Sequence, residues 1–154
     1  MPSRKAKARQ RISRTAVAGP RAPAGNSLRS LADKLGLKPG TARAILEAPE
    51  GFSDQVGTSE FDTSLDQDTY DFIHFFAVAD IALRNSFPIL SKRLKPNGML
   101  WISWPKKSSG VLTDLTEERV RDIGLANGLV DVKICAIDKT WSGLKFVYRL
   151  KDRP

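Results

Sequence analysis

The chain has 154 residues, 41% hydrophobic and 27% charged, an ordinary balance for one globular domain with its own core. Its one cysteine and one histidine are too few for a disulfide framework or a zinc site, and no apolar run reaches the roughly twenty residues of a membrane span. We therefore expect a cytoplasmic protein with no metal and no membrane association.

The net charge of +8 is concentrated at the N-terminus. Seven of the 25 cations and none of the 17 acidic residues lie within residues 1–26, so residues 27–154 are nearly neutral. Arg, Lys, Ala, Pro and Gly dominate the first segment, which cannot bury enough apolar surface to fold. We predict a disordered basic tail over residues 1–26 and a single α/β domain over residues 27–154. An Arg-rich transit peptide is an alternative interpretation of the tail.

The first part of the domain alternates between short apolar patterns and turns. Leucines at helical spacing predict a helix from an N-cap at Ser27 to Gly36, and residues 42–48 predict the first strand, which Pro49 closes. The polar stretch that follows predicts only a short helix near 52–56 and a weak strand near 59–62.

The second part carries stronger patterns. Residues 70–77 are almost all apolar, which is typical of a strand covered on both faces. Asp80 predicts the cap of a helix whose apolar stripe runs to Leu94, and Pro88 predicts a kink or two abutting pieces. The remaining predicted elements are a turn at 95–98, a strand at 99–104, a helix capped by Asp114 or Thr116 that ends at Ala126, and strands at 129–137 and 144–150 joined by a loop at 138–143.

This order of elements predicts an α/β fold. Strands separated by helices form parallel pairs with right-handed crossovers, and the helices then cover both faces of the sheet. The last two strands follow each other directly, so they predict an antiparallel hairpin. We therefore expect a three-layer, mostly parallel sheet with a C-terminal antiparallel hairpin.

From Tyr70 onward the order resembles the second half of a class I methyltransferase fold, which also closes with an antiparallel strand. Several short motifs resemble an uncharacterised bacterial family, a domain of unknown function. They are Leu-Gly-Leu-Lys-Pro-Gly at 35–40, Trp-Pro-Lys-Lys at 104–107, Ser-Gly-Val at 109–111, Thr-Asp-Leu-Thr-Glu at 113–117, Gly-Leu-Val-Asp at 128–131 and Trp-Ser-Gly-Leu-Lys at 141–145. The resemblance covers residues 28–150 and implies a truncated, Rossmann-like methyltransferase fold.

The loop after the first strand departs from the methyltransferase pattern. Such enzymes need a glycine-rich turn there, so that the backbone can approach the cofactor and the next helix can point its N–H groups inward. Residues 47–52 instead read Glu-Ala-Pro-Glu-Gly-Phe, and Pro49 has no N–H to donate. A full strand–helix–strand unit also needs roughly 30 residues, more than lie between Pro49 and Thr69. We expect no S-adenosylmethionine binding in the usual way, and no cofactor.

Ligands of an open parallel sheet bind beyond the carboxyl ends of its strands. In the predicted order, this edge collects polar residues and one tryptophan, namely Glu50, Asp80, Lys106, Lys107, Ser108, Ser109, Asp138 and Trp141. Two lysines followed by hydroxyls, a glycine and a helix N-terminus suit a phosphate or carboxylate. The alternative is a solvated loop whose lysines only keep the end of the sheet soluble.

The remaining chemically capable residues favour structural roles. His74 lies inside the most apolar strand and is expected to be a hydrogen-bonded core histidine, and Cys135 an inert buried thiol. Trp101 and Trp104 have opposite parity on one strand, so they should face opposite sides of the sheet. Trp141 is expected to be the most exposed of the three tryptophans. No catalytic constellation emerges from the sequence.

Three functions are compatible with these observations. The first is a non-catalytic binding or interaction module, whose working surface is the edge around Lys106, Lys107, Asp138 and Trp141. The second is an enzyme that acts on an anionic or nucleotide-like ligand at the same edge. The third is a nucleic-acid-associated protein that binds phosphates through the cations of its tail, Arg4, Lys5, Lys7, Arg9, Arg11 and Arg14.

Overall fold

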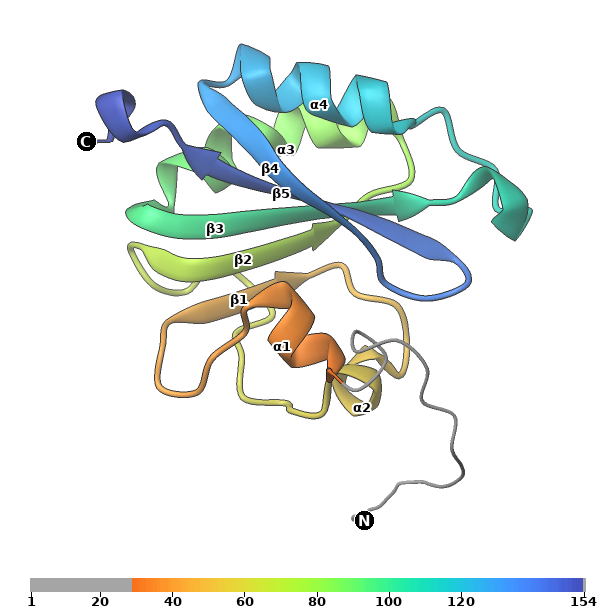
Figure 1. Ribbon diagram of the computed structural model, residues 1–154, viewed down its shortest axis with the longest axis horizontal. Helices are drawn as coiled ribbons and strands as arrows, with labels where there is room; N and C mark the ends of the chain where they lie inside the picture. The colour runs from red at the N-terminus through yellow and green to blue at the C-terminus, as the bar shows by residue number, and fades with distance from the viewer. Residues whose placement is uncertain (1–28, 154) are drawn as a thin grey trace. The chain divides into compact units, whose positions relative to one another are not determined.

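The computed structural model describes residues 29–153, and the compact unit considered below begins at Leu31. The predicted tail and the predicted cap at Ser27 lie outside the described residues. Five strands form one sheet in the order β1-β2-β3-β5-β4 (Figure 1). They are β1 (Arg43–Leu46), β2 (Tyr70–Phe76), β3 (Leu94–Pro105), β4 (Leu129–Ala136) and β5 (Trp141–Tyr148). The first three are parallel, and β5 runs antiparallel to both β3 and β4, so the predicted α/β sheet with a closing hairpin is confirmed.

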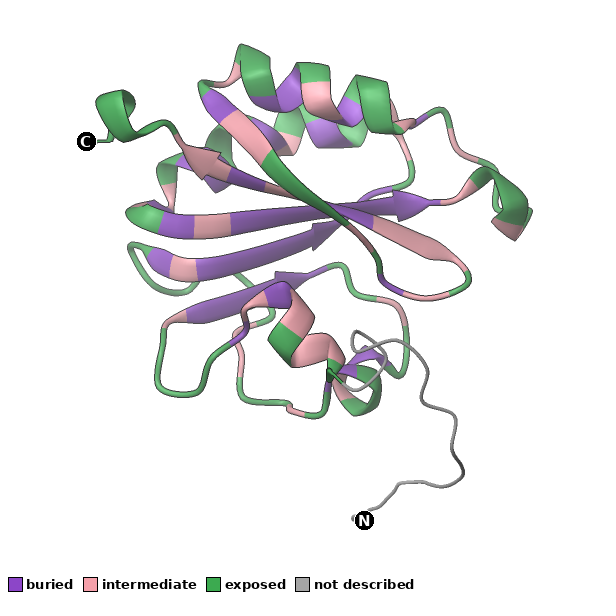
Figure 2. Ribbon diagram, in the orientation of Figure 1, coloured by how far each residue is buried: buried purple, intermediate pink, exposed green. Residues whose placement is uncertain are grey.

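Helices cover both faces of this sheet, as a three-layer architecture requires. They are α1 (Leu31–Leu35), α2 (Phe52–Val56), α3 (Asp80–Lys92) and α4 (Glu117–Ala126), with short 3-10 turns η2 (Lys107–Ser109) and η3 (Leu150–Asp152). One core cluster joins the sheet to α3 and α4, and a second joins it to α1 and α2. The buried strands between these layers are purple in Figure 2.

The structure confirms several predictions made from sequence patterns. Six of the seven residues of β2 are buried, as its unbroken apolar run predicts. Trp101 belongs to the α1 and α2 core and Trp104 to the α3 and α4 core, which confirms that they face opposite sides. Helix α4 ends at Ala126 as predicted, and the Thr116 hydroxyl caps it by accepting a hydrogen bond from the Arg119 amide at 3.2 Å.

The helix after β2 differs from the prediction in three respects. Ala79 occupies the N-cap position, while the Asp80 carboxylate forms ion pairs with Arg84 and Arg119. α3 is one continuous helix through Pro88, not two pieces. Leu94 does not continue the helical stripe but begins β3, because it pairs in register with Tyr70 of β2.

Three further predictions, next to β1, in β5 and in β4, also change. The weak strand at 59–62 is reduced to a single bridge between Asp62 and Ala44 of β1. β5 begins at Trp141, three residues earlier than predicted, because the amides of Ile137 and Asp138 both bond to the Trp141 carbonyl and close a shorter loop. Cys135 is half-buried and not fully buried, since β4 is an edge strand.

Candidate functional site

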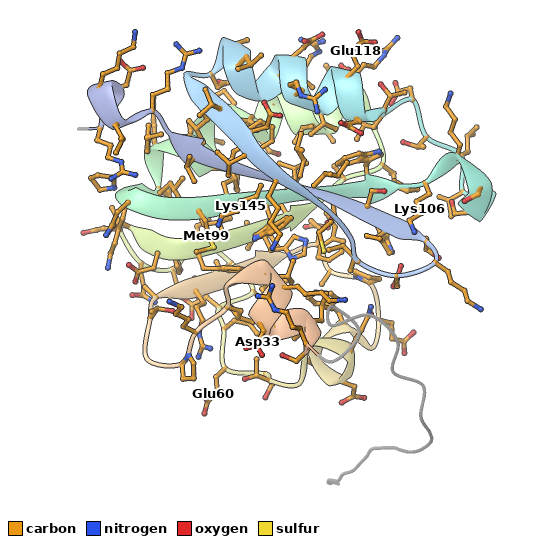
Figure 3. All side chains as sticks on the ribbon, viewed as in Figure 1. Asp33, Glu60, Met99, Lys106, Glu118 and Lys145 are labelled. Carbon is orange, nitrogen blue, oxygen red and sulfur yellow. The ribbon has the colours of Figure 1, made fainter. Side chains whose placement is uncertain are left out.

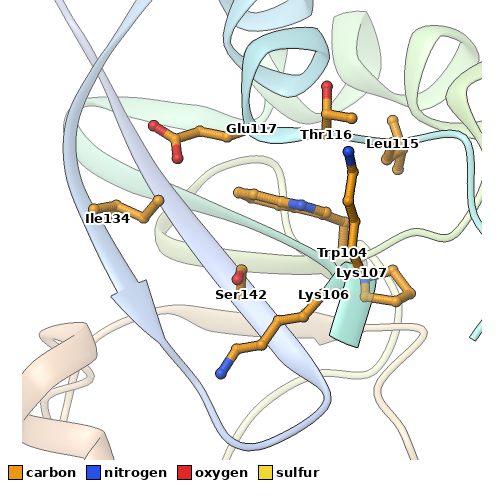
Figure 4. Close-up of a pocket in the computed structure, with 9 residues that line it drawn as sticks. Trp104, Lys106, Lys107, Leu115, Thr116, Glu117, Ile134 and Ser142 are labelled. Atoms are coloured by element: carbon orange, nitrogen blue, oxygen red, sulfur yellow. The ribbon is translucent and has the colours of Figure 1, made fainter. Parts of the chain in front are cut away.

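A pocket of about 220 Å³ opens at the carboxyl end of β3, on the face of the sheet that α3 and α4 cover. Trp104 lies at its centre and is only 5% exposed, while Ser142 of β5 lies directly across from Trp104 in the strand register (Figure 4). The other lining residues are Pro105, Lys106, Lys107, Leu115, Thr116, Glu117 and Ile134. The pocket thus combines an aromatic and aliphatic interior with charged groups at its rim.

The two lysines at the rim point in different directions. Figure 4 shows the Lys107 side chain extending toward Thr116 at the start of α4, and the Lys106 side chain extending in the opposite direction. Neither lysine forms an ion pair within residues 29–153. They therefore flank the pocket and do not converge on one point.

The acidic residue at the rim is already ion-paired. Glu117 forms an ion pair with Arg121, whose Nε also lies 2.9 Å from Asp131 of β4. These two carboxylates raise the pKa of Arg121 above its ordinary value, so its positive charge is fixed at all working pH. Lys106, Lys107 and Arg121 together exceed Glu117 and Asp131 by one positive charge, so the rim is positive because of the two lysines.

Ser108 and Ser109 contribute to this edge in a different way. The Ser109 hydroxyl donates to the Lys106 carbonyl at 2.6 Å and accepts from the Val111 amide at 3.1 Å, which holds the turn after β3 in shape. Ser108 is exposed within η2 and does not line the pocket. Ser109 thus positions the loop that carries the lysines.

Asp138 and Trp141 lie on the opposite face of the sheet. The Asp138 carboxylate accepts hydrogen bonds from the Thr140 and Trp141 amides at 2.8 Å and from the Gln55 side chain of α2 at 3.1 Å. Trp141 is half-buried, more exposed than the other two tryptophans, and its ring meets Phe76 edge-on with centroids 5.1 Å apart. Glu50 is exposed in the loop before α2. The candidate residues share one edge of the sheet, but the sheet itself separates these from the two lysines.

The structure gives His74 the predicted role in the core. Its Nε2 lies 2.7 Å from the Ser103 hydroxyl oxygen, it is fully buried, and burial lowers its pKa to about 3. Aromatic rings of Phe52, Phe72, Phe76 and Trp101 surround it. Within residues 29–153, no group of three His, Cys, Asp or Glu side chains could hold a metal ion, and no helix is long and apolar enough to cross a membrane.

Reasoning from the sequence missed several residues of the pocket. It assigned Trp104 to packing, Thr116 to a helix cap and Ser142 to a loop. Strand parity could have placed Trp104 in the pocket. Trp104 and Lys106 are two residues apart at the end of β3, so they lie on the same face of the extended chain. The pairing of β3 with β5, which brings Ser142 beside Trp104, has no signature in the sequence.

The topology defines the fold. Parallel strands β1 to β3, helices on both faces and a C-terminal antiparallel hairpin make a Rossmann-like fold of the class I S-adenosylmethionine-dependent methyltransferase type. No family model matches the chain, and no curated protein matches it significantly.

Solved structures of methyltransferases share this fold at low sequence identity. A ribosomal-protein methylase from Lactobacillus delbrueckii subsp. bulgaricus is 13% identical with a TM-score of 0.54, over 77% of this chain and 75% of that chain. Magnesium protoporphyrin IX methyltransferase from Synechocystis PCC 6803, solved with bound S-adenosylmethionine, is 13% identical with a TM-score of 0.53, over 77% and 74%. A methyltransferase from Aquifex aeolicus is 14% identical with a TM-score of 0.51, over 75% and 86%. At these identities the likeness is one of fold.

The loop between β1 and α2 does not fit S-adenosylmethionine in the way that such a fold uses it. Pro49 offers no N–H there, and its carbonyl accepts a hydrogen bond from the Phe52 amide at 3.2 Å. α2 has only five residues, too few to present a helix terminus of full strength. The Phe52 ring is 2% exposed and packs against Phe76 and His74, with centroids 5.0 and 5.5 Å away. The space next to the strand ends is therefore occupied by the protein's own side chain.

Proposed function

We propose that this domain is a non-catalytic binding module that holds a small anionic ligand at the carboxyl end of β3. The observation that carries the proposal is the pocket around Trp104, with two lysines at its rim and its acidic residue, Glu117, already paired. The same proposal includes membership of the uncharacterised bacterial family that the sequence resembles. It also includes a cytoplasmic location, which is consistent with a single free thiol.

The dimensions and lining of the pocket narrow the chemistry of the ligand. A volume of about 220 Å³ is smaller than the roughly 300–1,000 Å³ typical of drug-sized ligands, so the pocket suits a single ring or one side chain. Trp104, Leu115 and Ile134 favour an apolar body. The Lys107 ammonium and the first amides of α4 favour a carboxylate or phosphate at its end. An aromatic acid has this combination.

Benzoate and phenyl phosphate test this proposal, with benzyl alcohol as the uncharged counterpart. We expect the two anions to raise the thermal stability of the full chain, since a ligand at a hundred times its Kd adds about 2.7 kcal/mol. Lys107→Ala should weaken binding more than Lys106→Ala, because only the Lys107 side chain extends toward the start of α4. Lys139→Ala and Lys151→Ala remove the same charge from exposed positions that do not line the pocket.

A substitution inside the pocket and an uncharged ligand test the anion site directly. Ser142→Leu would place a larger side chain inside the pocket and should abolish binding while the domain stays folded. Equal binding of benzyl alcohol, or equal losses in the Lys139→Ala control, would contradict an anion site. Turnover of phenyl phosphate by the wild-type chain would favour the enzyme over the binding module.

A second candidate function is association with nucleic acid through the tail. The supporting observation is the concentration of seven cations without an acidic residue in residues 1–26. Such a segment binds phosphates without sequence preference and with steep salt dependence. Replacing Arg4, Lys5, Lys7, Arg9, Arg11 and Arg14 with glutamine should remove most of that salt dependence, and an unchanged salt dependence would contradict this function.

A further inference from the structure

The face of the β4–β5 hairpin that looks toward α1 carries two lysines, and α1 adds a third. Lys133 and Lys145 lie directly opposite each other in the strand register. Lys34 lies in the last turn of α1, and its carbonyl oxygen accepts a hydrogen bond from the Lys133 ammonium at 3.0 Å. None of the three forms an ion pair within the described part of the chain. We call Lys34, Lys133 and Lys145 the lysine cluster.

This arrangement is electrostatically unfavourable for the domain by itself. Like charges directly opposite each other across two strands repel and destabilise a sheet. Lys145, labelled on β5 in Figure 3, is half-buried and lies opposite Trp101 of β3 in the strand register. Burial lowers the pKa of Lys145, and the positive charge of Lys133 lowers it further. A bound anion would offset both effects, because it supplies the missing counter-charge.

The charge distribution along the chain favours an anion on this side of the domain. Residues 44–71, which include most of β1, contain eight acidic residues and no Lys or Arg. Residues 133–153, which include half of β4 and all of β5, contain six cations and two acidic residues. Because β1 and β4 are the two outer strands of the sheet, the acidic and basic segments lie at opposite edges. The resulting field steers anions toward the hairpin.

We propose that the lysine cluster binds the phosphate backbone of a nucleic acid. Lysine binds phosphate as a flexible point charge, and a nucleic acid repeats that charge at every nucleotide. The chain carries a separate basic segment at residues 1–26, so a ligand with many phosphates matches both regions better than a single small anion does. The cluster lies on the opposite face of the sheet from the Trp104 pocket and rests on none of its residues. It extends the second candidate function to the folded domain.

The test uses the full chain and a short fluorescein-labelled oligouridylate, with anisotropy titrations from about 50 to 200 mM salt. The double variant Lys34→Ala/Lys145→Ala removes two ammonium groups and keeps the bond from Lys133 to the Lys34 backbone. We expect the slope of log K against log salt to become shallower by about 1.4, since each phosphate contact on a single strand contributes about 0.7. The matched control is Lys92→Ala/Lys151→Ala, which removes two exposed lysines of α3 and η3 and should leave the slope almost unchanged.

The same titrations in the tail-neutralised chain separate the two basic regions. With Arg4, Lys5, Lys7, Arg9, Arg11 and Arg14 changed to glutamine, the residual binding should be lost in Lys34→Ala/Lys145→Ala. A slope that the double variant does not change, or that the control changes equally, would overturn the proposal while leaving the tail function intact. Competition by polyglutamate as effective as by oligouridylate would also overturn it, because an acidic protein would then fit the cluster equally well.

Discussion

The imidazole of His74 and the hydroxyl of Ser103 form a buried hydrogen-bonded pair inside the sheet, on neighbouring strands and with Nε2 and Oγ 2.7 Å apart. Both side chains are fully buried, and the other ring nitrogen of His74, Nδ1, has no hydrogen-bond partner. Such a pair is stable only while the imidazole is neutral, since burial of an unpaired charge is costly. The pair therefore links the stability of the domain to pH.

Acidification should destabilise the domain through His74. Burial lowers the pKa of His74 from 6.5 to about 3, so between these values the unfolded chain binds a proton that the folded chain excludes. The free energy of unfolding is therefore at its full value about one pH unit above 6.5 and falls as the pH is lowered, by about 2 kcal/mol at pH 5. Urea denaturation at pH 7.5 and pH 5 measures this difference. The variant His74→Leu/Ser103→Ala removes both polar groups, and an equally steep loss of stability in it would exclude His74 as the cause.

A second prediction concerns the contact of α4 with the sheet. A Cβ built on Gly124 would lie 2.1 Å from the ring of Phe146, which is fully buried and packs edge-on against Phe87. Gly124→Ala should therefore cost about 2 kcal/mol or more, although alanine by itself favours a helix by about 1 kcal/mol over glycine. Denaturant titration measures the change. Phe146→Leu in the same chain should recover part of the loss, and a fully stable Gly124→Ala would show that α4 can move away from β5.

Much of the fold follows from local patterns that the sheet preserves. The unbroken apolar run of β2 and the cap and stop signals around α4 correspond to real boundaries, because burial on both faces and helix termination are local requirements. The predicted start of β5 was wrong because Ser142 and Gly143 are residue types that favour loops. In the structure a Cβ on Gly143 would lie 3.1 Å from Ile137 and 3.2 Å from Trp101, so the glycine marks a close approach inside the strand.

The candidate site was only partly accessible to the same reasoning. Chain order places Lys106 and Lys107 at the end of a central strand, and the structure has them there. It also predicts Asp138 and Trp141 at this edge, but cannot tell which face each residue takes. That assignment depends on the register of β3 with β5, which pairs Pro105 with Trp141 and Trp104 with Ser142. Long-range register is a tertiary property, and no local pattern encodes it.

A third prediction concerns S-adenosylmethionine. Because Pro49 and the buried Phe52 occupy the place where the fold would receive the adenosyl group, the cofactor should not stabilise the wild-type chain. Thermal-shift measurements with increasing S-adenosylmethionine should show no saturable rise in Tm. Phenyl phosphate in parallel provides the positive comparison for the Trp104 pocket. A saturable rise with S-adenosylmethionine that Ser142→Leu does not affect would mean that the chain binds the cofactor outside the pocket.

The two tryptophans of β3 should respond differently to the same substitution. The Trp101 ring nitrogen donates to the Leu35 carbonyl at 2.7 Å, so Trp101→Phe leaves a buried carbonyl without a partner and should cost about 2–3 kcal/mol. Amide exchange in α1 should accelerate in the same variant, because this bond ties the end of α1 to the sheet. Trp104 forms no side-chain hydrogen bond within residues 29–153, so Trp104→Phe should cost less stability and mainly weaken phenyl phosphate binding. Equal stability losses, with equal changes in exchange at α1, would contradict this division between a structural and a ligand-facing tryptophan.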